Sequence, residues 1–337
     1  MLRWIRYIAL ASGGLLTVAL LVGAGYETHG RRASARDFPP RGRLIDIGGR
    51  RIQLDCRGAG SPTVVFESGM GIDGALSWST VHDSIAKATR TCAYSRAGIM
   101  WSDRRSGPRI GESVAEDLHA TLRAAGERPP LVMVGHSSGG PYVLAYTERY
   151  GADVAGVVFV DASHPNQFSR FREVSPVTLQ LAMRPLRIAA ALNWTGLVRA
   201  ISARAGSEGH EPPEVARAKA AYASTSLGAM IAEADGFDST LAAAAASHQL
   251  GDRPLVVLTA GAPPSQRELT TMQMTPAQGM RRSAIWKGMQ DEEATWSSRS
   301  QHTVVSDATH YIQFDRPDVV IAAVRSVIDS VRVRRGL

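Results

Sequence analysis

Short apolar runs alternate with longer segments of helical period along most of the chain. Several of these runs are continuously hydrophobic, as strands buried on both faces of a parallel sheet must be. Alternation of such strands with helices predicts a doubly wound α/β domain, with a mainly parallel sheet and helices on both of its faces. The runs that we expect to form strands cover residues 44–47, 51–56, 63–68, 91–95, 131–137, 156–162, 254–261 and 302–308.

The long stretch between the sixth and seventh of these runs interrupts the alternation of strands and helices. It is rich in Ala and Leu, with helical patterning at 176–204 and 213–249. A connection of this length is usually a functional lid, so we assign about 163–250 to a helical cap over the carboxyl edge of the sheet. The apolar faces of these helices either line a substrate pocket or pack the cap itself. They include Met183, Leu186, Ile188 and Leu192.

The amino-terminal part of the chain differs from the rest. Residues 7–26 carry no charge, and as a helix they would span roughly 30 Å, the hydrocarbon thickness of a bilayer. Residues 1–26 are therefore expected to be a membrane signal anchor or a cleaved signal peptide, and both remain open. Residues 27–43 are polar and Arg-rich and contain Pro-Pro, which predicts a linker. The folded domain is expected over 44–337.

The charge of the chain bears on its partners. The formal net charge is +7, but almost all of the excess comes from arginines in the first 51 residues. The body therefore lacks the basic surface that would indicate a nucleic-acid partner. The arginines that follow the apolar segment outnumber those before it, which by the positive-inside rule weakens the case for a domain outside the cytoplasm.

A candidate nucleophile stands in the G-x-S-x-G pattern that Gly135, Ser137 and Gly139 form. The apolar run LVMV precedes the pattern and a helical segment follows it. Ser137 is therefore expected on a sharp strand-to-helix turn, where small neighbours allow a strained backbone and the hydroxyl projects from the sheet.

Five segments of the chain, taken in order, resemble α/β-hydrolase-fold enzymes. They are VVFESGMG, YSRAGIMWSD, GHSSGG, VFVDASHP and SDATHYIQFDRPD. Over roughly residues 44–330 the chain is similar to the capped hydrolases that include esterases, haloperoxidase-like enzymes and proline iminopeptidases. The resemblance implies the α/β-hydrolase fold, an eight-stranded sheet with a cap inserted after the sixth strand, and serine hydrolase chemistry without a metal or organic cofactor.

A serine hydroxyl needs a base within hydrogen-bond reach. In this fold the histidine comes last in the chain, and His310 follows the end of the final predicted strand, whereas His302 lies at its start, the wrong edge. We therefore expect His310 to be the general base. His82, His119 and His136 are interpreted as structural.

The triad acid is less directly indicated. Many family members place it after the seventh strand, where this chain has no carboxylate until Glu268. Asp161 ends the sixth strand at a spacing from the serine similar to that in haloalkane dehalogenases, and it is our candidate. Asp291 or Glu292 is the alternative, while Asp307 lies too close to His310 along the chain.

The resemblance also suggests an oxyanion hole and a disulfide. The backbone N–H of Ser138, the residue after the nucleophile, is one expected donor, and that of Met70, in the loop after the third strand, is the other. The strand order 1-2-4-3-5-6-7-8 of the fold brings Cys56 and Cys92 together. A disulfide between them would favour an oxidising, extracytoplasmic compartment.

These features predict hydrolysis of a carboxylic ester or related acyl bond of a small, apolar substrate through an acyl-Ser137 intermediate. An aminopeptidase of the proline iminopeptidase kind is an alternative, with Glu233 of the cap binding the substrate amino group. A membrane-tethered binding protein without catalysis is another. The chain is expected to be membrane-anchored or secreted, and its oligomeric state is open.

Overall fold

The computed structural model describes residues 2–175, 177–204 and 211–336. Within these residues, eight strands form one sheet in the order β1-β2-β4-β3-β5-β6-β7-β8. β2 is antiparallel to both β1 and β4, and the remaining neighbours are parallel. The predicted sheet is confirmed. Its strands are β1 (Arg43–Asp46), β2 (Arg51–Arg57), β3 (Thr63–Glu67), β4 (Thr91–Ser95), β5 (Leu131–His136), β6 (Val154–Val160), β7 (Leu255–Ala260) and β8 (Ser300–Val305).

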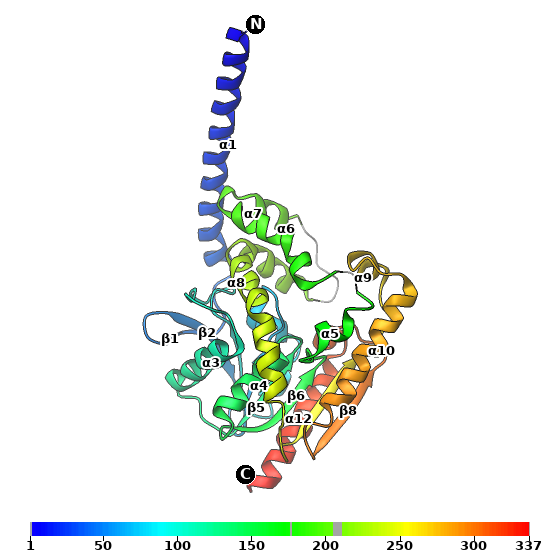
Figure 1. Ribbon diagram of the computed structural model, residues 1–337. Helices are drawn as coiled ribbons and strands as arrows, with labels where there is room; N and C mark the ends of the chain where they lie inside the picture. The colour runs from blue at the N-terminus through cyan, green and yellow to red at the C-terminus, as the bar shows by residue number, and fades with distance from the viewer. Residues whose placement is uncertain (1, 176, 205–210, 337) are drawn as a thin grey trace.

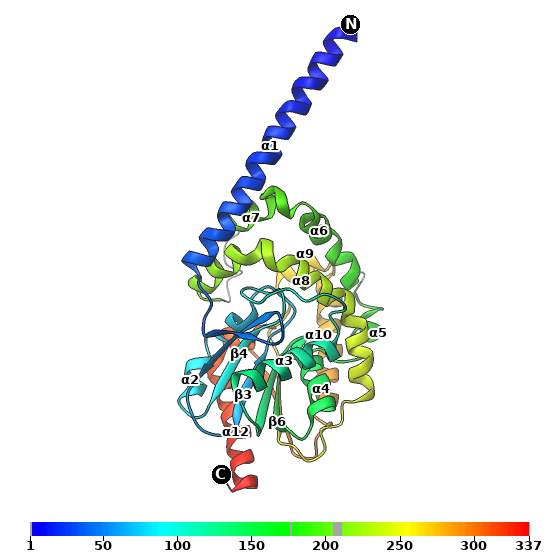
Figure 2. The ribbon, with the colours of Figure 1, turned by 90° about the vertical axis from the view of Figure 1, so that its left-hand side faces the viewer.

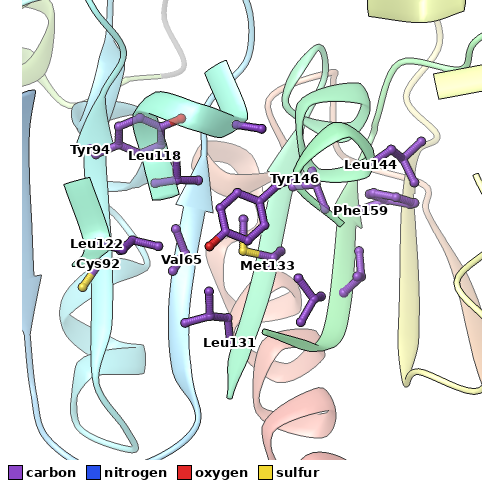
Figure 3. Close-up of a cluster of buried hydrophobic side chains, with 14 of the residues drawn as sticks. Val65, Cys92, Tyr94, Leu118, Leu122, Leu131, Met133, Leu144, Tyr146 and Phe159 are labelled. Atoms are coloured by element: carbon purple, nitrogen blue, oxygen red, sulfur yellow. The ribbon is translucent and has the colours of Figure 1, made fainter. Parts of the chain in front are cut away.

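Helices cover both faces of this sheet. On one face, α3 (Gly111–Ala125) and α4 (Gly139–Tyr150) pack on side chains such as Val65 and Met133, as Figure 3 shows. On the other face, α2 (His82–Ala86) and α12 (Pro317–Arg335) pack on Val64 and Val134. Successive strand residues point to opposite faces, so continuously apolar strands fill both layers of the core.

The insertion between β6 and β7 is helical and forms a cap (Figures 1 and 2). The predicted cap after the sixth strand is confirmed; residue 176 and residues 205–210 of it, like the chain ends 1 and 337, lie outside the described residues. The longest cap helix, α8, contacts α3 and α4 as well as α6 and α7. The cap elements are α5 (Gln167–Phe171), α6 (Leu179–Ala191), η2 (Asn193–Thr195), α7 (Leu197–Ser202) and α8 (Pro213–Ala246).

Shorter elements complete the connections between the strands. The 3-10 turn η1 follows β3, two helices lie between β7 and β8, and one turn of helix precedes α12. Their bounds are η1 (Gly74–Trp78), α9 (Gln266–Thr271), α10 (Pro276–Glu293) and α11 (Ile312–Asp315).

The amino-terminal helix α1 (Leu2–Asp37) projects from the body at the cap side (Figure 1). It is the one described helix that is long and apolar enough to cross a membrane. The expectation of a linker over 27–43 is wrong for residues 27–37, which continue the helix. The reason is tertiary: Glu27 and Ser34 are buried against the cap, where Arg199 hydrogen-bonds to both.

A disulfide joins β2 to β4. Cys56 and Cys92 are register partners in these antiparallel strands, and their sulfurs are bonded. The predicted pairing is confirmed, because the crossed strand order puts these two segments side by side.

Candidate active site

Ser137 lies on a tight turn between β5 and α4. Its φ of 52° falls in the left-handed region, which is strained for a residue with a side chain. A Cβ on Gly135 would lie 2.8 Å from the Gly139 carbonyl oxygen, and one on Gly139 would lie 2.4 Å from that of Glu67. Only glycines fit at these two positions, so the G-x-S-x-G pattern is explained by backbone packing around the serine.

The imidazole of His310 is hydrogen-bonded to the carboxylate of Asp161. Nδ1 lies 2.6 Å from Oδ2. The Asp161 side chain is 3% exposed and that of His310 is 35% exposed, so the acid is buried while the ring reaches the solvent-accessible side. Because Asp161 accepts at Nδ1, the other ring nitrogen of His310 is the one free to accept a proton.

Asp161 is held by two further donors, both directed at Oδ1. The backbone N–H of Ala260, at the end of β7, lies 2.8 Å away, and the indole Nε1 of Trp286, on α10, also lies 2.8 Å away. With Oδ1 engaged, Oδ2 is left for His310. Sequence reasoning missed Trp286, because nothing local marks an indole as the partner of a carboxylate 125 residues earlier.

His136 supports the backbone of His310. Its Nε2 lies 2.8 Å from the His310 carbonyl oxygen, and burial, together with the nearby His310, lowers the pKa of His136 to about 3. The neutral ring therefore donates its N–H to that carbonyl. This agrees with the structural interpretation of His136 made from the sequence.

The other candidate groups lie elsewhere. Asp291 pairs with Lys287, and Glu292 pairs with Arg170. Neither of these alternative acids contacts His310 among the described residues.

Asp307 and His302, which the sequence analysis set aside, also have partners other than His310. Asp307 is bound by Arg316. The imidazole of His302 hydrogen-bonds to Thr259. The arrangement therefore brings together Ser137, His310 and Asp161 at the carboxyl ends of β5, β8 and β6.

The two candidate oxyanion donors flank the serine. Ser138 is the N-cap residue of α4, and Met70 lies in the loop after β3, which lines the same cavity as Ser137. Within the described part of the chain, neither backbone N–H donates to another group. Gly69 allows the loop to approach, since a Cβ there would lie 3.1 Å from the Ser137 Cβ.

A buried arginine fixes that loop. Arg96, just after β4, donates to Glu67 at 2.7 Å and to the carbonyl oxygens of Ser68 and Gly69 at 2.7 and 2.8 Å. It also binds both carboxylate oxygens of Glu233 on α8, each at 2.8 Å. The loop and the cap therefore share one cation, which explains why Glu67 is buried beside the site.

A cavity of about 420 Å³ lies between the loop and the cap, and Ser137 and His310 both line it. Its apolar wall is formed mainly by cap side chains, among them Leu186, Val198, Ile201, Leu227 and Met230. Lys219 and Asp73 also line the cavity, and they lie 3.5 Å apart. Of the four cap residues singled out from the sequence, Leu186 alone lines this cavity in the described structure, whereas Ile188 and Leu192 are exposed.

One group of side chains in the described part of the chain has the spacing of metal ligands. Among the described residues, the group close enough to share an ion is Cys56, Cys92 and Glu127. The two sulfurs are bonded to each other, so no thiolate is available there.

In sequence, this chain matches known proteins over part of its length. YbdG, an uncharacterized protein of Bacillus subtilis, is 24% identical over 39% of this chain and 41% of its own length. The 2-hydroxy-6-oxo-2,4-heptadienoate hydrolase of Pseudomonas putida is 32% identical over 36% of this chain. This chain thus spans less than half the length of these curated relatives, with 44% covered in the hydrolase.

The fold is shared with solved structures over most of the molecule. A thermophilic esterase from Thermogutta terrifontis superposes with a TM-score of 0.61, covering 86% of this chain and 98% of the esterase at 18% identity. The family model described as alpha/beta hydrolase fold matches residues 62–317. That range contains Ser137, Asp161, His310 and the cap, and the chain belongs to the alpha/beta hydrolase fold family.

Proposed function

We propose that the protein is a serine hydrolase that cleaves a carboxylic ester, or a related acyl bond, through an acyl-Ser137 intermediate. The observation that carries the proposal is the 2.6 Å contact between His310 Nδ1 and the buried Asp161 carboxylate, with His310 and Ser137 on the wall of one cavity. A serine becomes a useful nucleophile only when an oriented base accepts its proton. The Asp161 contact orients such a base.

In the proposed reaction, His310 takes the hydroxyl proton of Ser137 through Nε2 while the oxygen attacks the acyl carbonyl. Asp161 keeps the correct imidazole tautomer and stabilises the imidazolium. His310 then returns the proton to the leaving alcohol, and water releases the acyl group by the reverse sequence. The N–H groups of Met70 and Ser138 would stabilise the oxyanion, at roughly 3–4 kcal/mol for each donor.

The lining of the cavity supports an apolar acyl substrate. Leu186, Val198 and Leu227 face it from the cap, and apolar walls of this kind bind hydrocarbon by excluding water. The esterase from Thermogutta terrifontis shows that the same fold carries ester chemistry in another protein. The aminopeptidase alternative is less well supported, since Glu233 is 1% exposed and both of its carboxylate oxygens are bound by Arg96.

We also propose that α1 is an uncleaved membrane anchor and that the hydrolase domain lies outside the cytoplasm. Gly23 and Tyr26 contact the cap segment around Gly196, so the end of the apolar run forms part of the folded structure. The Cys56–Cys92 disulfide supports an oxidising compartment. Amino-terminal sequencing of the protein from washed membranes tests the first point: a start beyond residue 26 would contradict it.

Ester turnover in four variants tests the enzymatic proposal. Ser137→Ala, His310→Ala and Asp161→Asn should each lower the turnover of a nitrophenyl acyl ester by a factor on the order of 10⁴. Ser138→Ala is the matched control, because it keeps the backbone N–H, and the hydroxyl that it removes is buried without a hydrogen-bond partner in the described structure. If Asp161→Asn turned the ester over at the wild-type rate, Asp161 would not be the acid of the triad.

A further inference from the structure

Five large apolar side chains of the cap are exposed, on three elements that contact one another. They are Ile188 on α6, Leu192 and Trp194 at η2, and Leu197 and Ile201 on α7, all more than two-fifths exposed. We call these five residues the cap ridge. A contiguous patch of large apolar side chains on a protein surface usually marks an interaction site.

The ridge lies at the foot of the amino-terminal helix. Figures 1 and 2 both place α6 and α7 at the end of the body from which α1 projects, with the carboxyl terminus at the opposite end. The backbone of α1 packs closely against this part of the cap. A Cβ on Gly23 would lie 2.2 Å from the carbonyl oxygen of Thr195, which follows the ridge residue Trp194.

The sequence of α1 indicates where this contact would lie relative to a bilayer. Gly23 belongs to the uncharged segment 7–26, and Glu27 is the first charged residue after it. At 1.5 Å per residue, Gly23 lies about 6 Å further along the helix than Glu27, on the apolar side. Side chains packed at the level of Gly23 therefore lie at the depth where the apolar segment enters a bilayer.

A buried ion pair holds the ridge at that level. Arg199 on α7 binds Glu27 at 2.9 Å and donates to Ser34 and Ser224 at the same distance. The side chains of Arg199 and Glu27 are 8% and 3% exposed. Because these bonds link α7 and α8 to α1, the cap and the helix are expected to keep one orientation.

The ridge also adjoins the candidate active-site cavity. Ile201 is 60% exposed on the surface and lines the cavity as well, while Leu186 and Val198 line it from the same two helices. The apolar wall of the cavity is thus continuous with the apolar surface at the foot of α1.

We propose that the cap ridge is immersed in the interfacial layer of the bilayer that α1 spans, and that the cavity takes its acyl chain from that layer. The substrate class is a membrane-resident amphiphile with an apolar acyl group in ester linkage. Amphipathic surfaces bind at this depth through buried apolar area, and Trp is favoured there. This inference rests on the proposed ester hydrolysis and anchoring.

Fluorescence of Trp194 in vesicles tests the immersion independently of activity. The full chain is reconstituted with Trp4→Phe, which removes the tryptophan of the membrane segment, in phosphatidylcholine brominated near the top of the acyl chains. Quenching is expected, and it should disappear when Trp194→Phe is added. Equal quenching with and without Trp194, or none in either protein, would overturn the proposal.

Turnover of two substrates tests whether the acyl chain enters the cavity from the bilayer. The ridge variant Ile188→Glu/Leu197→Glu avoids the residues that line the cavity. It should hydrolyse a soluble short-chain ester at the wild-type rate and a long-chain ester in vesicles about tenfold or more slowly, because two charged side chains would oppose immersion of the ridge.

Val333→Glu is the control, because Val333 is 84% exposed on α12, at the opposite end of the body. A ridge variant that hydrolyses the vesicle ester at the wild-type rate would contradict entry of the acyl chain from the bilayer. A wild-type protein inactive on both esters would instead count against the proposed function, and Trp194 quenching would still decide whether the ridge is immersed.

Discussion

Arg96 binds both carboxylate oxygens of Glu233, at 2.8 Å each, and so connects the loop beside Ser137 to the longest helix of the cap. The same guanidinium donates to the carbonyl oxygens of Ser68 and Gly69. The position of the candidate oxyanion loop therefore depends on a cap residue far along the chain.

Replacing Arg96 by Ala should strongly destabilise the protein. Glu67 and Glu233 are each 1% exposed, and loss of their common cation leaves two buried carboxylates facing each other, at a cost of about 3–5 kcal/mol. Urea unfolding of the full chain in detergent measures the loss. Arg316→Ala is the control: Arg316 bridges Asp307 and Asp318 at the surface, and its loss should leave the free energy of unfolding nearly unchanged.

Trp286→Phe should impair ester turnover while leaving the fold intact. The change removes the N–H that holds Asp161 Oδ1, so the carboxylate orients His310 less well, and a fall of about tenfold in kcat is expected for one lost hydrogen bond of roughly 1.5 kcal/mol. Trp101→Phe is the matched control, because that indole donates to the Phe38 carbonyl oxygen instead. Equal kcat in both variants would show that Trp286 does not position Asp161 for catalysis.

Acid should weaken the fold through His136. Burial lowers the pKa of His136 to about 3 in the folded protein, against about 6.5 in the unfolded chain. Below pH 6.5 the imidazole of His136 is protonated in the unfolded state but stays neutral in the folded state. The free energy of unfolding therefore falls as pH drops toward 3, by up to about 1.4 kcal/mol per pH unit.

The measurement is the pH dependence of unfolding for the wild type and for His136→Gln. Glutamine can still donate to the His310 carbonyl oxygen but does not titrate, so its curve should be flatter below pH 6.5. Parallel curves for the two proteins would show that His136 carries no such linkage.

Removing the disulfide should lower stability without abolishing the site. Cys56 and Cys92 close a loop with a sequence separation of 36, and the chain-entropy model gives about 4 kcal/mol for a loop of this size. Thermal unfolding of the Cys56→Ser/Cys92→Ser double variant, compared with the wild type under non-reducing conditions, checks this value. An unchanged transition, with the bond verified in the wild type by peptide mapping, would contradict it.

The sequence predicts the sheet well because each strand is a local signal. Continuous apolar runs mark the strands, and the glycines around Ser137 mark the turn, so the fold and the meeting of Ser137, Asp161 and His310 at one edge could be anticipated. Their catalytic roles remain predictions. The course of α1 beyond Glu27 could not be anticipated, because its polar residues are ordered by Arg199, a partner distant in the chain.

The contacts that support the site were missed for the same reason. Trp286 and Arg96 act through partners 125 and 137 residues away. Trp286 stands in no recognisable motif, and Arg96 stands in the family-like segment YSRAGIMWSD, which does not indicate that Glu233 is its partner. The surroundings of the cap side chains were also not predicted. Helical period puts Ile188 and Leu192 on one face and Leu186 on nearly the opposite one, but it does not reveal which face lines a cavity and which is exposed.

The reaction of the folded protein with a fluorophosphonate probe tests the central claim most directly, because this reagent requires an activated serine. The account predicts one covalent adduct, mapped to Ser137 by peptide mass. The adduct should persist in Ser138→Ala, disappear in Ser137→Ala and form far more slowly in His310→Ala. Absence of labelling in folded wild-type protein, or an adduct that survives Ser137→Ala, would contradict it.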